Sequence, residues 1–157
     1  MDKNDHFESR EITGLNAVFD ELETHCHSRA IITITGSSGE SFRFDMERTT
    51  NGIEYADDLG ESMLVRTRFL RLAAESGGAA VTVRSFTDKN HHRTGLPYKE
   101  LRGYLLREHE GRLECNQLAA ESVREAFTTD ATTGEPIDPE IEAIYCGPNT
   151  CIMEDSA

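Results

Sequence analysis

Acidic side chains dominate the last third of the chain and carry its clearest chemical signal. Residues 113–157 contain ten Asp and Glu residues and one arginine, a net charge of −9. A surface with this charge attracts a basic protein and repels nucleic-acid phosphates. The acids that we expect to form a partner-binding site, on a predicted helix and in the segment after it, are Glu121, Glu125, Asp138 and Glu140.

A second candidate site lies in the one segment with a positive charge balance. Residues 84–112 contain seven Lys and Arg residues against four acids, and they include two adjacent histidines. Such a patch can bind an anionic ligand, and its histidines can exchange protons in acid–base chemistry. Ion pairs along a solvated helix are the simpler explanation of these charges. The residues of this candidate anion site are Arg66, His91, His92, Arg93 and Arg102.

Two pairs of side chains offer the ligand types of a zinc site. They are His25 with His27, and Cys146 with Cys151. Structural zinc sites usually have two residues between their cysteines, whereas four lie between Cys146 and Cys151, so we expect no metal and no cofactor. The same spacing argues against a redox-catalytic cysteine pair and favours a Gly-Pro turn or a labile surface disulfide.

Composition predicts one cytoplasmic domain. The chain has 157 residues, of which 37% are hydrophobic and 29% charged, enough for one core under a solvated surface. Residues 1–6 are polar and do not form a signal peptide, and no apolar run is long enough to cross a membrane. We expect reduced cysteines, a flexible segment 1–10, a single domain 11–145, and a cysteine-containing turn with a mobile tail at 146–157.

Hydrophobic spacing predicts the elements of the first half. Apolar residues at helical spacing predict a helix over 11–26, and alternation predicts strands over 31–35 and 42–45 joined by a Gly-Ser turn. An Asn-Gly turn leads into a third strand at 53–55. Residues 62–72 fit either a helix or a strand, and the strand is favoured because a helix would place Arg66 in its apolar face.

The second half is expected to begin with a strand over 79–86. Helices are predicted over 97–109 and 114–127, followed by a loop over 128–139. The predicted fold is α+β, an antiparallel β-meander with an N-terminal helix and a C-terminal αα-hairpin packed on one face. The expected core contains Phe19, Leu22, Phe42, Phe44, Val81, Val83, Leu118 and Val123.

The sequence favours binding over catalysis. It contains no nucleophile elbow, phosphate-binding glycine loop or metalloprotease helix. We expect an acidic, non-enzymatic regulatory or inhibitory module that binds a basic protein by imitating nucleic-acid charge. A small enzyme or anion-binding domain centred on His91, His92 and Arg93 is the alternative. The charge balance, with 13 Arg against 3 Lys and abundant acids, also fits a high-GC genome or a salt-adapted cytoplasm, in which case the acidity is a property of the whole proteome. Direct DNA binding is disfavoured because the last predicted helix has one cation, Arg124, and three glutamates, so its net charge is negative.

Overall fold

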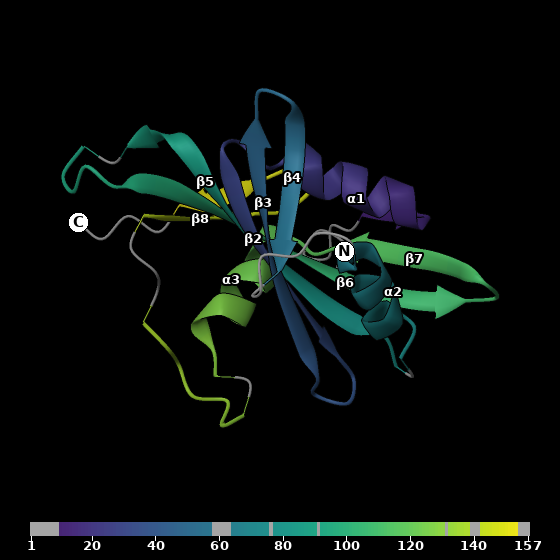
Figure 1. Cartoon of the computed structure of the whole chain (residues 1–157). Helices are drawn as coiled ribbons and strands as arrows, with labels where there is room; N and C mark the ends of the chain where they lie inside the picture. The colour runs from purple at the N-terminus through teal and green to yellow at the C-terminus, as the bar shows by residue number, and fades with distance from the viewer. Residues whose placement is uncertain are drawn as a thin grey trace.

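A twisted antiparallel sheet is the frame of the molecule (Figure 1). The computed structural model describes residues 10–57, 64–75, 77–90, 92–130, 132–138 and 142–153. Its strands are β1 (Arg10–Thr13), β2 (Arg29–Gly36), β3 (Ser41–Thr49), β4 (Gly52–Asp57), β5 (Ala79–Asn90), β6 (Pro97–His109), β7 (Arg112–Gln117), β8 (Ala143–Cys146) and β9 (Cys151–Met153). Its helices are α1 (Leu15–Thr24), α2 (Val65–Ala73) and α3 (Ala120–Thr128). The predicted α+β class with an antiparallel sheet is confirmed.

The strand order is β1-β7-β6-β5-β2-β3-β4. Strand β6 has two partners on the same edge, because β7 pairs antiparallel with one half of it and β8 pairs parallel with the other half. Strand β9 then pairs with β8. The last strands of the chain therefore complete the sheet beside β6.

The meander β2-β3-β4 follows the predicted alternation. Ile32 lies opposite Phe44 and Ile34 opposite Phe42, so the apolar residues of both strands share one face. Gly52 has a φ of 118°, the left-handed region that the Asn-Gly turn requires. The hairpin and the third strand are therefore confirmed.

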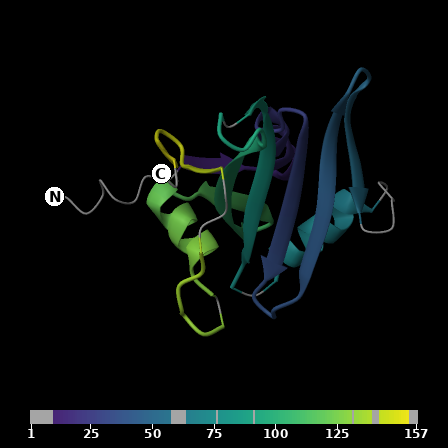
Figure 2. The ribbon, with the colours of Figure 1, turned by 90° about the vertical axis from the view of Figure 1, so that its left-hand side faces the viewer.

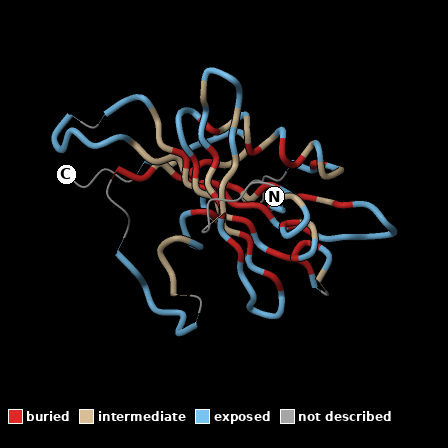
Figure 3. Tube along the Cα trace, in the orientation of Figure 1, coloured by how far each residue is buried: buried red, intermediate tan, exposed pale blue. Residues whose placement is uncertain are grey.

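The larger core lies on the face of the sheet covered by α1 and α2. Phe19 of α1 and Phe69 of α2 meet with their ring centroids 5.0 Å apart, and both side chains are fully buried. Figure 3 shows buried residues gathered where the strands cross and exposed residues at the ends of the hairpins. Seven of the eight predicted core residues are buried, and Leu118 is half-buried.

Helix α3 lies on the opposite face, which corrects the prediction that both helices pack on one face (Figure 2). Leu101 of β6 packs in a second core with Val123, Ala143 and Tyr145, whereas Tyr104 packs in the larger core. Positions 101 and 104 differ in parity, so their side chains point to opposite faces of the strand. Each face of the sheet therefore has its own core, covered by its own helix or helices.

Residues 65–73 form a helix, which corrects the preference for a strand over 62–72. Residues 62 and 63 lie outside the described residues. The arginines that argued against a helix lie over aromatic rings: the Arg66 guanidinium is 4.4 Å from the centroid of Phe19, and that of Arg68 is 4.2 Å from the centroid of Phe42. Cation–π contact and an apolar stem let arginine cover a core with its charge in solvent.

The predicted αα-hairpin is wrong, because residues 97–117 form the β6-β7 hairpin. Both faces of β6 are covered over part of its length, so its apolar residues do not alternate simply and imitate a helical stripe. Glu110 and Gly111 have φ angles of 52° and 77°, the positive pair of a two-residue hairpin turn. Only the second part of the predicted helix 114–127 is helical, from Ala120.

The N-terminal helix is shorter than the predicted 11–26. Residues 10–13 form β1, paired with β7, and Gly14 with a φ of 95° separates this strand from α1. The rest of the predicted flexible segment, 1–9, and the end of the predicted tail, 154–157, lie outside the described residues. Within the part of the chain that the structure describes, every helix is too short or too polar to cross a membrane.

Candidate functional site

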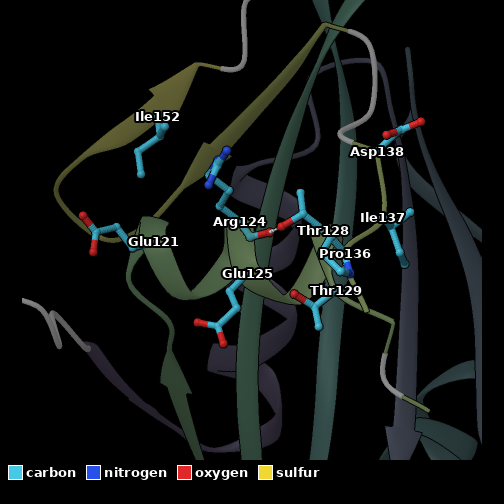
Figure 4. A pocket seen from close by; sticks show the side chains of 9 residues that line it. All are labelled: Glu121, Arg124, Glu125, Thr128, Thr129, Pro136, Ile137, Asp138 and Ile152. Atoms are coloured by element: carbon cyan, nitrogen blue, oxygen red, sulfur yellow. Dashed lines mark hydrogen bonds between the residues drawn. The ribbon is translucent and has the colours of Figure 1, made fainter. Parts of the chain in front are cut away.

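A groove of about 870 Å³ lies between α3 and the segment that follows it (Figure 4). Helix α3 forms one wall, residues 129 and 136–138 form the other, and β9 contributes one residue. The lining residues are Glu121, Arg124, Glu125, Thr128, Thr129, Pro136, Ile137, Asp138 and Ile152.

Helix α3 presents its polar residues to the groove because its apolar residues face the sheet. Ala120 and Val123 are buried, whereas Glu121, Arg124 and Glu125 are exposed. Residues three and four positions apart share one helix face, so these three side chains line one wall together with Thr128. The burial of Val123 thus fixes the direction in which the two glutamates point.

Backbone hydrogen bonds fold the segment after α3 back along the helix. Ile137 N donates to the Thr128 carbonyl at 2.7 Å, and residues 129 and 136 form an isolated antiparallel bridge. The carboxylate of Asp130 accepts hydrogen bonds from the backbone amides of Thr132 at 2.7 Å and Thr133 at 3.1 Å. This side-chain turn reverses the chain and brings residues 136–138 opposite the helix.

The groove combines negative charge with apolar surface. Glu121, Glu125 and Asp138 supply three carboxylates against the guanidinium of Arg124. Ile137 is 47% exposed and Ile152 is half-buried, so each can offer contact to an aliphatic chain. Lysine and arginine have an apolar stem and a charged end, which makes them the side chains that best match this lining.

Three of the four predicted partner-binding acids therefore meet in one groove. Glu121 and Glu125 lie one helical turn apart on α3, and Asp138 lies on the opposite wall (Figure 4). The fourth, Glu140, lies outside the described residues. The residues that sequence reasoning missed are the apolar ones, Ile137 and Ile152.

The candidate anion site is spread over separate elements. Arg66 on α2 donates to Asn16 Oδ1 at 2.8 Å, and Arg102 on β6 donates to Glu100 Oε1 at 2.9 Å. His92 and Arg93 lie in the β5-β6 connection, at the opposite end of the molecule from α2 (Figure 1). His91 lies outside the described residues. The described hydrogen bonds link Arg66 and Arg102 to different elements.

The four zinc candidates also separate into two pairs. His25 Nε2 donates to Glu21 Oε2 at 3.0 Å, and His27 Nε2 donates to Glu100 Oε1 at 3.0 Å. Cys146 and Cys151 face each other across β8 and β9. Over the described ranges, no group of three or more His, Cys, Asp or Glu side chains is arranged to hold a metal ion.

A polar network at the C-terminal end of α1 was not foreseen from the sequence. Burial disfavours ionised Glu21, but hydrogen bonds from His25 and Tyr104, with the charges of His25 and Arg10, outweigh it and lower the pKa of Glu21 to about 2. Burial and the neighbouring Glu21 carboxylate raise the pKa of Tyr104 well above its usual value. Glu21 and Tyr104 are 83 residues apart, so only the i,i+4 spacing of Glu21 and His25 was visible in the sequence.

Comparison with models of protein families, with curated proteins and with solved structures gives no match. The residues of the groove are therefore the basis of the functional proposal.

Proposed function

We propose that this chain is a non-enzymatic regulatory or inhibitory module that binds a basic segment of a partner protein in the groove beside α3. The observation that carries the proposal is that Glu121, Glu125 and Asp138 line one groove together with the apolar side chains of Ile137 and Ile152. Lysine or arginine side chains of the partner would lay their apolar stems on Ile137 or Ile152 and place their cations near the carboxylates.

The charge of the whole chain supports the same kind of partner. The formal net charge of −13 increases the rate of encounter with a basic protein and disfavours direct binding of nucleic acid. A partner that uses its basic surface to hold nucleic acid would lose that surface when bound, which is the inhibitory mode that we propose. Four free thiols fit a cytoplasmic setting.

Neutralising the groove tests this proposal. The test protein carries Glu121→Gln, Glu125→Gln and Asp138→Asn, and the probe is a labelled peptide rich in arginine and leucine. Exposed ion pairs contribute roughly 0.5 kcal/mol each, so we expect the affinity of the peptide to fall about tenfold, with a smaller dependence on salt.

The matched control makes the same change in net charge elsewhere on the surface. Glu11→Gln, Glu54→Gln and Asp88→Asn replace three exposed acids on β1, β4 and β5. We expect this variant to keep most of the affinity. Equal losses in the two variants would mean that the peptide responds to overall charge, and the groove would then not be the binding site.

A further inference from the structure

Cys146 and Cys151 lie directly opposite each other at the end of the β8-β9 hairpin. The hairpin is closed by a hydrogen bond from Gly147 N to the Thr150 carbonyl at 2.8 Å. Opposite residues of an antiparallel pair have Cα atoms about 4.5 to 5.5 Å apart, within the range of about 4.4 to 6.8 Å that a disulfide spans. The two sulfur atoms are already in contact, with the Cys151 thiol donating to Cys146 Sγ at 2.6 Å. A bond between them therefore requires little movement of the backbone.

The two thiols differ in exposure, which gives them different roles in an exchange reaction. Cys151 is exposed, whereas Cys146 is 1% exposed. Burial raises the pKa of Cys146, with a further contribution from its hydrogen bond with Cys151, and the charge of Arg102 opposes both. The exposed thiol meets a soluble oxidant first, and the buried thiol reacts with the product.

The other two cysteines serve as internal controls. Cys26, in the connection between α1 and β2, and Cys115, on β7, are both buried in the larger core. Burial raises the pKa of Cys115 to about 12, with a further contribution from the charge of Glu21. Neither thiol is placed to compete for an oxidant in the folded protein.

We propose that Cys146 and Cys151 form a reversible dithiol–disulfide site whose co-substrate is a low-molecular-weight disulfide such as glutathione disulfide. The Cys151 thiolate attacks one sulfur of glutathione disulfide, forms a mixed disulfide and releases one glutathione thiolate, which takes a proton. The Cys146 sulfur then attacks the Cys151 sulfur, the mixed disulfide breaks, and a second glutathione leaves with the proton of Cys146. Two protein thiols are oxidised and one glutathione disulfide is reduced to two thiols.

Oxidation of this site also acts on the acidic groove, an extension that rests on the function proposed above. Ile152, adjacent to Cys151, lines the groove, and Tyr145, adjacent to Cys146, packs in the second core with Val123 of α3. A Cβ on Gly147 would lie 2.5 Å from Ala120 N, so the hairpin is seated tightly against the start of α3. The disulfide would hold Ile152 in place before a ligand arrives, and pre-ordering one side chain increases affinity about threefold.

Thiol counting after equilibration with glutathione disulfide and glutathione tests the site itself. Protein quenched in acid, unfolded and alkylated should lose two of its four reactive thiols, with a peptide map joining Cys146 to Cys151. Cys151→Ser should retain its three thiols, and Cys26→Ala should still lose two. Retention of all four thiols in the wild type, a stable mixed disulfide at Cys151, or an intramolecular bond in Cys151→Ser would overturn the proposal.

The arginine-rich peptide tests the coupling separately. We expect the oxidised wild type to bind it about threefold more tightly than the reduced protein, with no such difference in Cys151→Ser. If the affinity is equal in both redox states although the disulfide has formed, the coupling to the groove is refuted and the dithiol–disulfide site still stands. Absence of peptide binding in either state would refute the groove function while the thiol count still decides the site.

Discussion

Replacing Glu21 with glutamine should destabilise the fold at neutral pH and flatten its acid sensitivity. The Glu21 carboxylate is 10% exposed and accepts hydrogen bonds from Tyr104 at 2.9 Å and His25 at 3.0 Å, with a further bond from Arg10. Glutamine preserves the shape and one acceptor oxygen but removes the charge. The three donors would then face a neutral group.

The expected magnitude follows from the lowered pKa. A folded pKa of about 2 against an ordinary value of 4.5 corresponds to about 3 kcal/mol at full strength. Arg10 is half exposed, which weakens its part through solvent screening, so we expect a loss of about 1.5 to 2 kcal/mol at pH 7. Because the folded pKa is the lower one, this stabilisation is complete above pH 4.5 and disappears as the pH falls toward 2.

Urea unfolding followed by far-ultraviolet circular dichroism measures the effect across this pH range. The free energy of unfolding of the wild type should fall more steeply between pH 4.5 and 2 than that of Glu21→Gln. Glu54→Gln on the exposed surface of β4 is the control and should follow the wild type. Parallel curves for Glu21→Gln and wild type, with equal stability at pH 7, would refute the reasoning.

Two further substitutions test the packing of the sheet and of α3, each measured by the same urea titration. Gly78→Ala should cost more than about 2 kcal/mol, because its Cβ would lie 2.3 Å from the Leu106 carbonyl oxygen at a φ of 86°. Gly95→Ala, also at positive φ but in open space, should cost only about 1 kcal/mol, and equal costs would contradict the clash. Val123→Ala should cost about 2 kcal/mol and shift the amide resonance of Ile152, and an unmoved Ile152 would show that the second core does not position the groove.

The elements that were predicted well from the sequence are those that bury only one face. In β2 and β3 the apolar residues alternate because the opposite face is more exposed, and the Asn51-Gly52 turn has few alternatives. Strand β6 was misread because Leu101 and Tyr104 fill different cores on opposite faces. Pattern reasoning assumes one buried face, so a strand that separates two cores is read as a helix.

The candidate site was predictable in its charge and not in its shape. Glu121 and Glu125 stand out from the composition of the last helix, and their shared face follows from helical spacing. The opposite wall depends on the turn at Asp130, which determines where Asp138 and Ile137 lie. A turn stabilised by one side chain has no periodic sequence pattern, so the position of the opposite wall could not be predicted from the sequence.

The two cores draw on different stretches of the chain, so we expect them to form at different stages of synthesis. Every residue of the larger core lies between positions 12 and 115, whereas the second core needs residues 143 and 145 to reach back to β6. The larger core can therefore form on the ribosome while the parallel partner of β6 is still inside the exit tunnel. Leu101 would stay uncovered during that interval, and Ile152 would join the acidic groove only when β9 pairs with β8. We therefore expect a nascent chain to form its larger core first and the second core last.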